Sequence, residues 1–138
     1  MARAERSGGS AAVFLDRDGT LIADRGPLLD PRDLELLPGV TAVVTPGHTR
    51  GHQSVKVESE GRVAFFLGDL IPAVSHLPLP YIMGYDLEPV QTLDSKRRVL
   101  ERACEEQWLL IFEHDPLIQA GYVSKNVDGK YVLREVTL

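Results

Sequence analysis

Three apolar stretches of this chain each end beside a residue that can bind a metal ion, and this pattern limits the fold more than any other feature. All three are short and are followed within three residues by a histidine or an aspartate: 43–45 by His48, 62–67 by Asp69 and 108–112 by His114. Runs of this length and composition are typical of buried strands. Because α/β sheets usually bind ligands where their strands end, we expect the three side chains to converge at one sheet edge.

The segment after residue 45 is predicted to be a tight loop. Pro46 and Gly47 favour a turn, and the apolar stretch 54–57 that follows His52 predicts another strand. Both histidines of this segment therefore lie on a loop and not on a helix face. A neutral imidazole on such a loop is a good zinc ligand, which makes His48 a candidate, whereas His52 is expected to brace the loop by hydrogen bonding.

The Pro-Gly-His-Thr loop, the Gly-Asp pair and the late Glu-His pair resemble the second half of a metallo-β-lactamase-fold hydrolase, from about Val43 to the C-terminus. The resemblance implies that His48, Asp69 and His114 bind one or two metal ions, Zn²⁺ or alternatively Mn²⁺ or Fe²⁺. The family's first-half motif, His-x-His-x-Asp-His, is missing, because none of the four histidines precedes residue 48. The resemblance therefore implies a metal-binding half-domain with weak or no activity on a small-molecule ester.

The N-terminal part carries a different pattern. An apolar strand is predicted at 11–15, and it ends in Asp16-Arg17-Asp18-Gly19-Thr20, a pair of carboxylates that suits Mg²⁺ chemistry. Residues 12–40 resemble the motif I segment of haloacid dehalogenase (HAD) phosphatases of the histidinol-phosphate and heptose-bisphosphate type. This resemblance implies that Asp16 is a nucleophile and Asp18 a general acid/base. It stops after residue 40, and Lys96 is interpreted as a solvated helix charge and not as a phosphatase lysine.

Together the two resemblances predict a chimera, engineered or recombinant, joined near residues 40–43. Three functions stay open: a metal-binding hydrolase-like protein, a Mg²⁺-dependent HAD-type phosphatase acting on phosphate esters, and a folded but catalytically inert chimera. If the strand 11–15 lies beside 43–45, Asp16 or Asp18 would share a site with His48.

The expected fold is α/β: a mixed sheet with one long helix at 88–107 and a C-terminal β-hairpin, forming half of a metallo-β-lactamase-like αββα sandwich with a HAD-derived N-terminal strand. Asp128-Gly129 between two β-rich runs predicts the hairpin, and the prolines after His76 predict a loop, with His76 at the surface. Residues 1–10 are expected to be a disordered arm. Residues 11–138 are expected to be a single domain made of segments 11–42 and 43–138.

The composition and net charge limit the classes of partner that the chain can bind. The 138 residues are 43% hydrophobic and 25% charged, as in a globular domain, and the net charge of −5 disfavours nucleic-acid binding. No apolar run approaches the ~18 residues of a membrane span. The single cysteine, Cys104, favours a reducing cytoplasm and is expected in the core. Half of a sandwich would expose an apolar sheet face, so a homodimer is expected.

Overall fold

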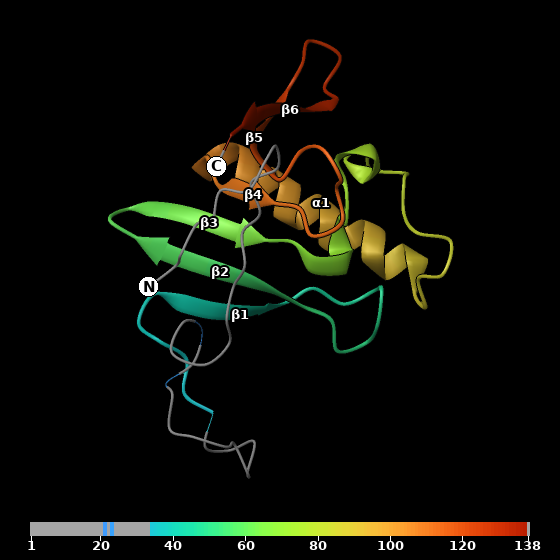
Figure 1. The fold of residues 1–138 in the computed structure, drawn as a ribbon. Helices are drawn as coiled ribbons and strands as arrows, with labels where there is room; N and C mark the ends of the chain where they lie inside the picture. Colours follow the sequence, from blue (N-terminus) through green and yellow to red (C-terminus); the bar gives the residue numbers. More distant parts are fainter. Residues whose placement is uncertain (1–20, 22, 24–33, 138) are drawn as a thin grey trace.

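The computed structural model describes residues 21, 23 and 34–137. In this part of the chain, six strands form one sheet in chain order and a single α-helix covers one of its faces (Figure 1). The elements are β1 (Val40–Val44), β2 (Gln53–Ser59), β3 (Arg62–Phe66), the 3₁₀ helices η2 (Gly68–Leu70) and η3 (Val74–His76), α1 (Pro89–Glu106), β4 (Leu109–Ile111), β5 (Ala120–Lys125) and β6 (Tyr131–Val136). No helix among these residues is long and apolar enough to cross a membrane.

The direction of the strands decides where their ends meet. β1, β2 and β3 pair antiparallel in succession, β3 pairs parallel with β4 across the α1 crossover, and β4, β5 and β6 are again antiparallel. β1, β3 and β4 therefore run in the same direction. Their C-terminal ends, which the sequence places before His48, Asp69 and His114, lie at one edge of the sheet.

The main core lies between the sheet and α1. Phe65 and Leu110 from the sheet and Leu100 from the helix are fully buried. The ring of Trp108 stacks on Phe65 with a centroid distance of 5.1 Å, and this indole is 2% exposed. Burying such aromatic and branched side chains stabilises a fold by roughly 1.5–3 kcal/mol each.

The opposite side of the sheet, which we call the outer face, is also apolar. The strand register aligns two rows of neighbouring residues there: Val57, Ala64, Leu109 and Tyr122 in one row, and Val55, Phe66, Ile111 and Ala120 in the other. Successive residues of a strand point to opposite faces, so these rows alternate with the helix-facing residues Phe65 and Leu110. A sheet that is apolar on both faces is typical of layered α/β folds.

Several sequence-based expectations are confirmed by these elements. The mixed sheet, the single long helix, the hairpin of β5 and β6 and the loop after His76 are all present within residues 34–137. The hairpin turn is closed by the Asn126 Oδ1 atom, which accepts from the backbone N–H groups of Asp128 and Lys130. Trp108 is in the core, as expected, whereas Cys104 is partly buried and packs against the core from outside. The predicted arm at 1–10 and the predicted HAD-derived strand at 11–15 lie outside the described residues.

The expectation that Lys96 is a solvated charge is wrong. Its side chain is completely buried, and its Nζ atom donates hydrogen bonds to four backbone carbonyls of the segment 76–81. The helical period explains the burial: residue 96 lies four positions after buried Thr92 and four before buried Leu100, so it shares their face of α1. The interpretation from sequence rests on the charge of Lys96, whereas its position in the helical period predicts burial.

Candidate metal centre

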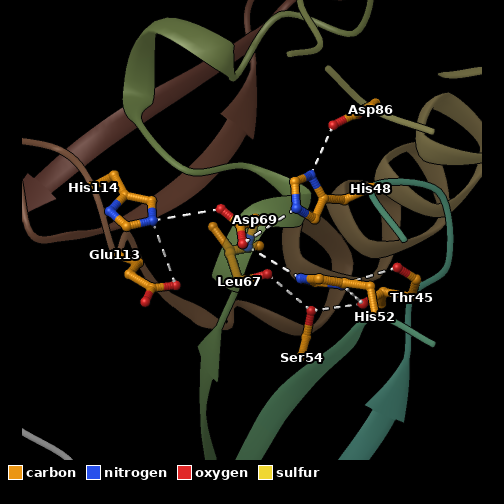
Figure 2. A network of polar contacts seen from close by, with 9 residues as sticks. All are labelled: Thr45, His48, His52, Ser54, Leu67, Asp69, Asp86, Glu113 and His114. Atoms are coloured by element: carbon orange, nitrogen blue, oxygen red, sulfur yellow. Dashed lines mark hydrogen bonds and ion pairs between the residues drawn. The ribbon is translucent and has the colours of Figure 1, made fainter. Parts of the chain in front are cut away.

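The ends of β1, β3 and β4 bring three side chains together (Figure 2). His48 lies on the loop after β1, Asp69 in η2 directly after β3, and His114 just after β4. The Nε2 atom of His48 is 3.6 Å from Oδ2 of Asp69, and the Nε2 atom of His114 is 3.4 Å from Oδ1 of the same carboxylate. Asp69 thus lies between two imidazoles and presents one oxygen to each, as the strand-end pattern predicted.

The loop that carries His48 is fixed against the start of α1. Ser95 donates its Oγ–H to the Pro46 carbonyl over 2.7 Å. Gly47 has a φ of 140°, and a Cβ at this position would overlap Thr92. A glycine is therefore required for the loop backbone to approach the helix this closely. The Pro-Gly pair places the next residue, His48, over the sheet edge.

A buried carboxylate orients the His48 ring. Oδ1 of Asp86 lies 3.0 Å from Nδ1 of His48, and the Asp86 side chain is only 1% exposed. An ionised carboxylate only accepts hydrogen bonds, so Nδ1 carries the proton and Nε2 faces Asp69. Histidines that bind metals usually have such a carboxylate behind the ring. Sequence analysis missed Asp86, which is 38 residues from His48 and lies in a loop without periodic pattern.

His52 braces its loop through Thr45, as expected, and it also holds the backbone of Asp69. The backbone N–H of Asp69 donates to Nε2 of His52 over 3.1 Å, which leaves the proton on Nδ1. Nδ1 lies 3.0 Å from the Thr45 carbonyl and 2.9 Å from its hydroxyl. The Thr45 hydroxyl contacts Ser54 Oγ, which donates to the carbonyl of Leu67. Every hydrogen bond in this chain has one allowed direction, so the His52 ring is held in a single neutral tautomer.

His114 is held differently. Its backbone N–H donates to the Pro72 carbonyl over 2.9 Å, but its side chain is 58% exposed, against 18% for His48. A second carboxylate, Glu113, approaches the His114 ring to 4.0 Å. Single ligand atoms of Asp69, Glu113 and His114 lie within 4.8 Å of one another. Glu113 was not predicted as a site residue, although its position next to His114 was a signal for it.

Asp115 fixes the backbone beneath His114. Its carboxylate accepts hydrogen bonds from the N–H groups of Val74, Leu117 and Ile118 at 2.8–2.9 Å. Burial by itself would raise the pKa of Asp115, but the backbone hydrogen bonds outweigh it and hold that pKa below its ordinary value. The ionised form of Asp115 therefore ties the β4–β5 loop to η3.

Each histidine, together with the Asp69 oxygen that faces it, fits a zinc ion. Imidazole nitrogens and carboxylate oxygens are common ligands of Zn²⁺, which has bonds of about 2.0–2.2 Å, so neighbouring ligands are roughly 3.3 Å apart. The imidazole–carboxylate distances of 3.4 and 3.6 Å are close to that spacing. Mn²⁺ and Fe²⁺ accept the same mixture of nitrogen and oxygen donors.

Three further residues discussed in the sequence analysis are His76, which was expected at the surface, and Asp16 and Asp18. His76 lies in η3, partly buried, where its Nδ1 contacts Ser75 Oγ over 3.3 Å. Asp16 and Asp18 lie outside the described residues, so the idea of a site shared with His48 stays a prediction.

Comparisons with known proteins point to one family. The family model described as "Metallo-beta-lactamase superfamily" matches residues 3–114. An N-acyl homoserine lactonase of Bacillus thuringiensis is 33% identical over 85 residues, which are 60% of this chain and 33% of the lactonase. The chain thus spans about a third of the length of the curated relatives it matches. The match also runs across segment 11–42, and no comparison supports a HAD segment or a fusion.

Two solved structures are similar in fold and sequence. A probable metal-dependent hydrolase from Staphylococcus aureus has a TM-score of 0.61 and 28% identity, covering 74% of this chain and 38% of its own. An N-acyl homoserine lactone hydrolase, with its product bound at the catalytic metal centre, has a TM-score of 0.50 and 29% identity, covering 59% of this chain and 33% of its own.

Proposed function

Since this chain belongs to the metallo-β-lactamase superfamily, we propose that His48, Asp69 and His114 bind a metal ion for the hydrolysis of a small-molecule ester. The observation that carries the proposal is the Asp69 carboxylate between two imidazoles whose Nε2 atoms face it. Asp69 offers a different oxygen to each histidine, so it could serve one ion or two. Zn²⁺ suits these donors best.

When bound, the metal supplies a Lewis acid and lowers the pKa of a coordinated water. The side chains of this chain do the positioning. Asp86 keeps the proton on Nδ1 of His48 and so leaves Nε2 as the ligand atom, while His52 holds the backbone of Asp69. Glu113 adds a carboxylate beside His114. The solvent exposure of His114 leaves an approach for substrate from that side.

The relatives narrow the substrate class. The curated relatives are N-acyl homoserine lactonases, and a lactone is a cyclic carboxylic ester. We therefore propose lactones and simple carboxylic esters as the substrates to assay. Because this sequence lacks the His-x-His-x-Asp-His motif, we expect weak hydrolysis at most, and we expect it to be lost with a chelator.

Metal binding is the most direct test. The wild-type chain, His48→Ala and His76→Ala are compared in equilibrium dialysis with Zn²⁺. The wild type should bind at least one equivalent, and His48→Ala should bind far more weakly. His76→Ala should match the wild type, because the His76 side chain contacts Ser75 at an exposed position and none of the proposed ligands among residues 34–137. A wild-type chain that holds only a small fraction of an equivalent in excess Zn²⁺ would contradict the proposal.

We also propose that a second copy of the chain covers the outer face. Its two apolar rows support this, because all their residues except Ala120 are only partly buried and an apolar face that stays accessible drives association. Sedimentation should show a dimer at micromolar concentration for the wild type and a monomer for Val57→Lys. Glu101→Lys, on the exposed side of α1, should stay dimeric. A monomeric wild type would overturn the assignment.

A further inference from the structure

A buried cation, Lys96, contacts the chain segment that leads to the candidate metal centre. The Nζ atom of Lys96 donates to the carbonyls of His76, Pro78, Leu79 and Tyr81; the bonds to Pro78 and Tyr81 are 2.6 and 2.8 Å long and that to Leu79 is 3.4 Å. An ammonium has three N–H donors, and here all of them face backbone oxygens. Unsatisfied buried carbonyls are costly, so this segment depends on Lys96 for its conformation.

The segment that Lys96 holds continues to the ring of His48. Five residues after Tyr81 comes Asp86, whose carboxylate accepts from Nδ1 of His48 at 3.0 Å. The next two residues bond the loop backbone: the N–H of Leu87 donates to the His48 carbonyl, and the N–H of Glu88 to Gly47. The segment 76–88 is therefore attached to α1 at one end and to the His48 loop at the other.

Electrostatics agree with this arrangement. Burial lowers the pKa of Lys96 to about 8, and the negative charge of Asp86 acts in the opposite direction. Most Lys96 side chains therefore remain ammonium ions at pH 7. The second oxygen of Asp86, Oδ2, is buried without a hydrogen-bond partner among the described residues. The Lys96 ammonium and the Asp86 carboxylate thus attract one another, which favours the position of Asp86 beside His48.

We propose that Lys96 is a positioning residue of the metal centre: by holding the backbone of 76–81, it places Asp86 behind His48 and so fixes the tautomer and direction of the His48 ring. The inference rests on the proposed function for its meaning, since the ring matters as a metal ligand. The tautomer of His48, however, can be measured in the metal-free chain.

The first measurement is therefore made without metal. Long-range ¹H–¹⁵N spectra of the apo-protein report which ring nitrogen of His48 carries the proton. The wild type should show the proton on Nδ1, and Lys96→Met, which keeps the chain length but has no donors, should show a mixture of tautomers. Arg97→Met removes the neighbouring exposed cation, which among the described residues pairs with Asp94, and should match the wild type.

The second measurement is a double-mutant cycle on the Zn²⁺ dissociation constant. Lys96→Met and Asp86→Ala should each weaken binding about 10–100-fold, the usual effect of losing a group that orients a ligand. If Lys96 acts through Asp86, the double variant should be no weaker than Asp86→Ala alone. Where Lys96→Met does not fold, Lys96→Gln, which keeps two N–H donors, takes its place in both measurements.

The outcomes separate the two proposals. A Lys96 variant that is less stable but keeps the wild-type His48 spectrum would overturn the positioning role, and so would losses of affinity that simply add. If the wild type binds no Zn²⁺ but the His48 tautomer still depends on Lys96, the proposed function fails and the positioning role stands.

Discussion

The two histidines of the candidate centre are held in opposite ways. The His48 ring is mostly buried, and its orientation comes from a side chain, Asp86, that is supported in turn by Lys96. The His114 ring is mostly exposed, and only its backbone is fixed, through Pro72 and the carboxylate of Asp115. The β1 side of the site is therefore preorganised by a buried side chain behind the ring, while the ring on the β4 side is held by its contacts with Asp69 and Glu113 at the surface.

The largest effect is expected where the two sides meet. Asp69→Ala removes the carboxylate that faces both imidazoles, so Zn²⁺ affinity should fall more than the 10–100-fold typical of orienting residues. Isothermal titration measures the loss, with His76→Ala as the control. Retention of wild-type affinity by Asp69→Ala would mean that the two histidines do not share an ion through this residue.

Asp86→Ala tests the buried side alone. It should lower Zn²⁺ affinity about 10–100-fold, because His48 would lose its fixed tautomer. Glu113→Ala provides the comparison on the exposed side and should have a smaller effect, since Glu113 approaches His114 only to 4.0 Å. The reverse order of effects would show that the exposed half controls binding.

Asp115→Asn tests how the exposed side is held. In the variant, one of the three backbone N–H groups would face an amide N–H₂ group instead of an oxygen. The variant should therefore lose about 1–2 kcal/mol of unfolding free energy at pH 7. The pKa of Asp115 is lowered by folding, so its contribution is complete above its unfolded pKa of 3.8 and disappears as pH falls through the folded value. Urea unfolding of both chains from pH 7 downwards should show the stability difference shrinking, and a difference that grows on acidification would contradict this account.

Ser54→Ala is expected to have the smallest effect. It removes the hydroxyl that connects Thr45 to the Leu67 carbonyl, and a loss of about 1 kcal/mol in unfolding free energy should follow. Zn²⁺ affinity should change little, because the bond from Asp69 to His52 remains. A loss of affinity as large as that of Asp86→Ala would mean that the whole hydrogen-bonded chain orients Asp69.

The location of the residues at the strand ends could be predicted from the sequence. Apolar runs predict strands, and parallel strands must deliver His48, Asp69 and His114 to one edge. The supporting residues could not be found in this way. Asp86 and Lys96 act from a loop and a helix, through contacts across 38 and 15–20 residues, which no local period records. An apolar strand that ends in aspartates is common to many folds, so Asp16 and Asp18 favoured a family that the comparisons do not support.

The hydrogen-bonded chain from Asp69 back to Leu67 has a consequence for strand register. It starts and ends within three residues of the β3 terminus, but it passes through Thr45 after β1 and Ser54 in β2. A slip of one residue between β1 and β2 would turn Ser54 to the opposite face of the sheet and interrupt the circuit. Asp69 can therefore reach its final position only after β1, β2 and β3 have paired in the correct register. Formation of the candidate centre thus depends on correct assembly of this half of the sheet.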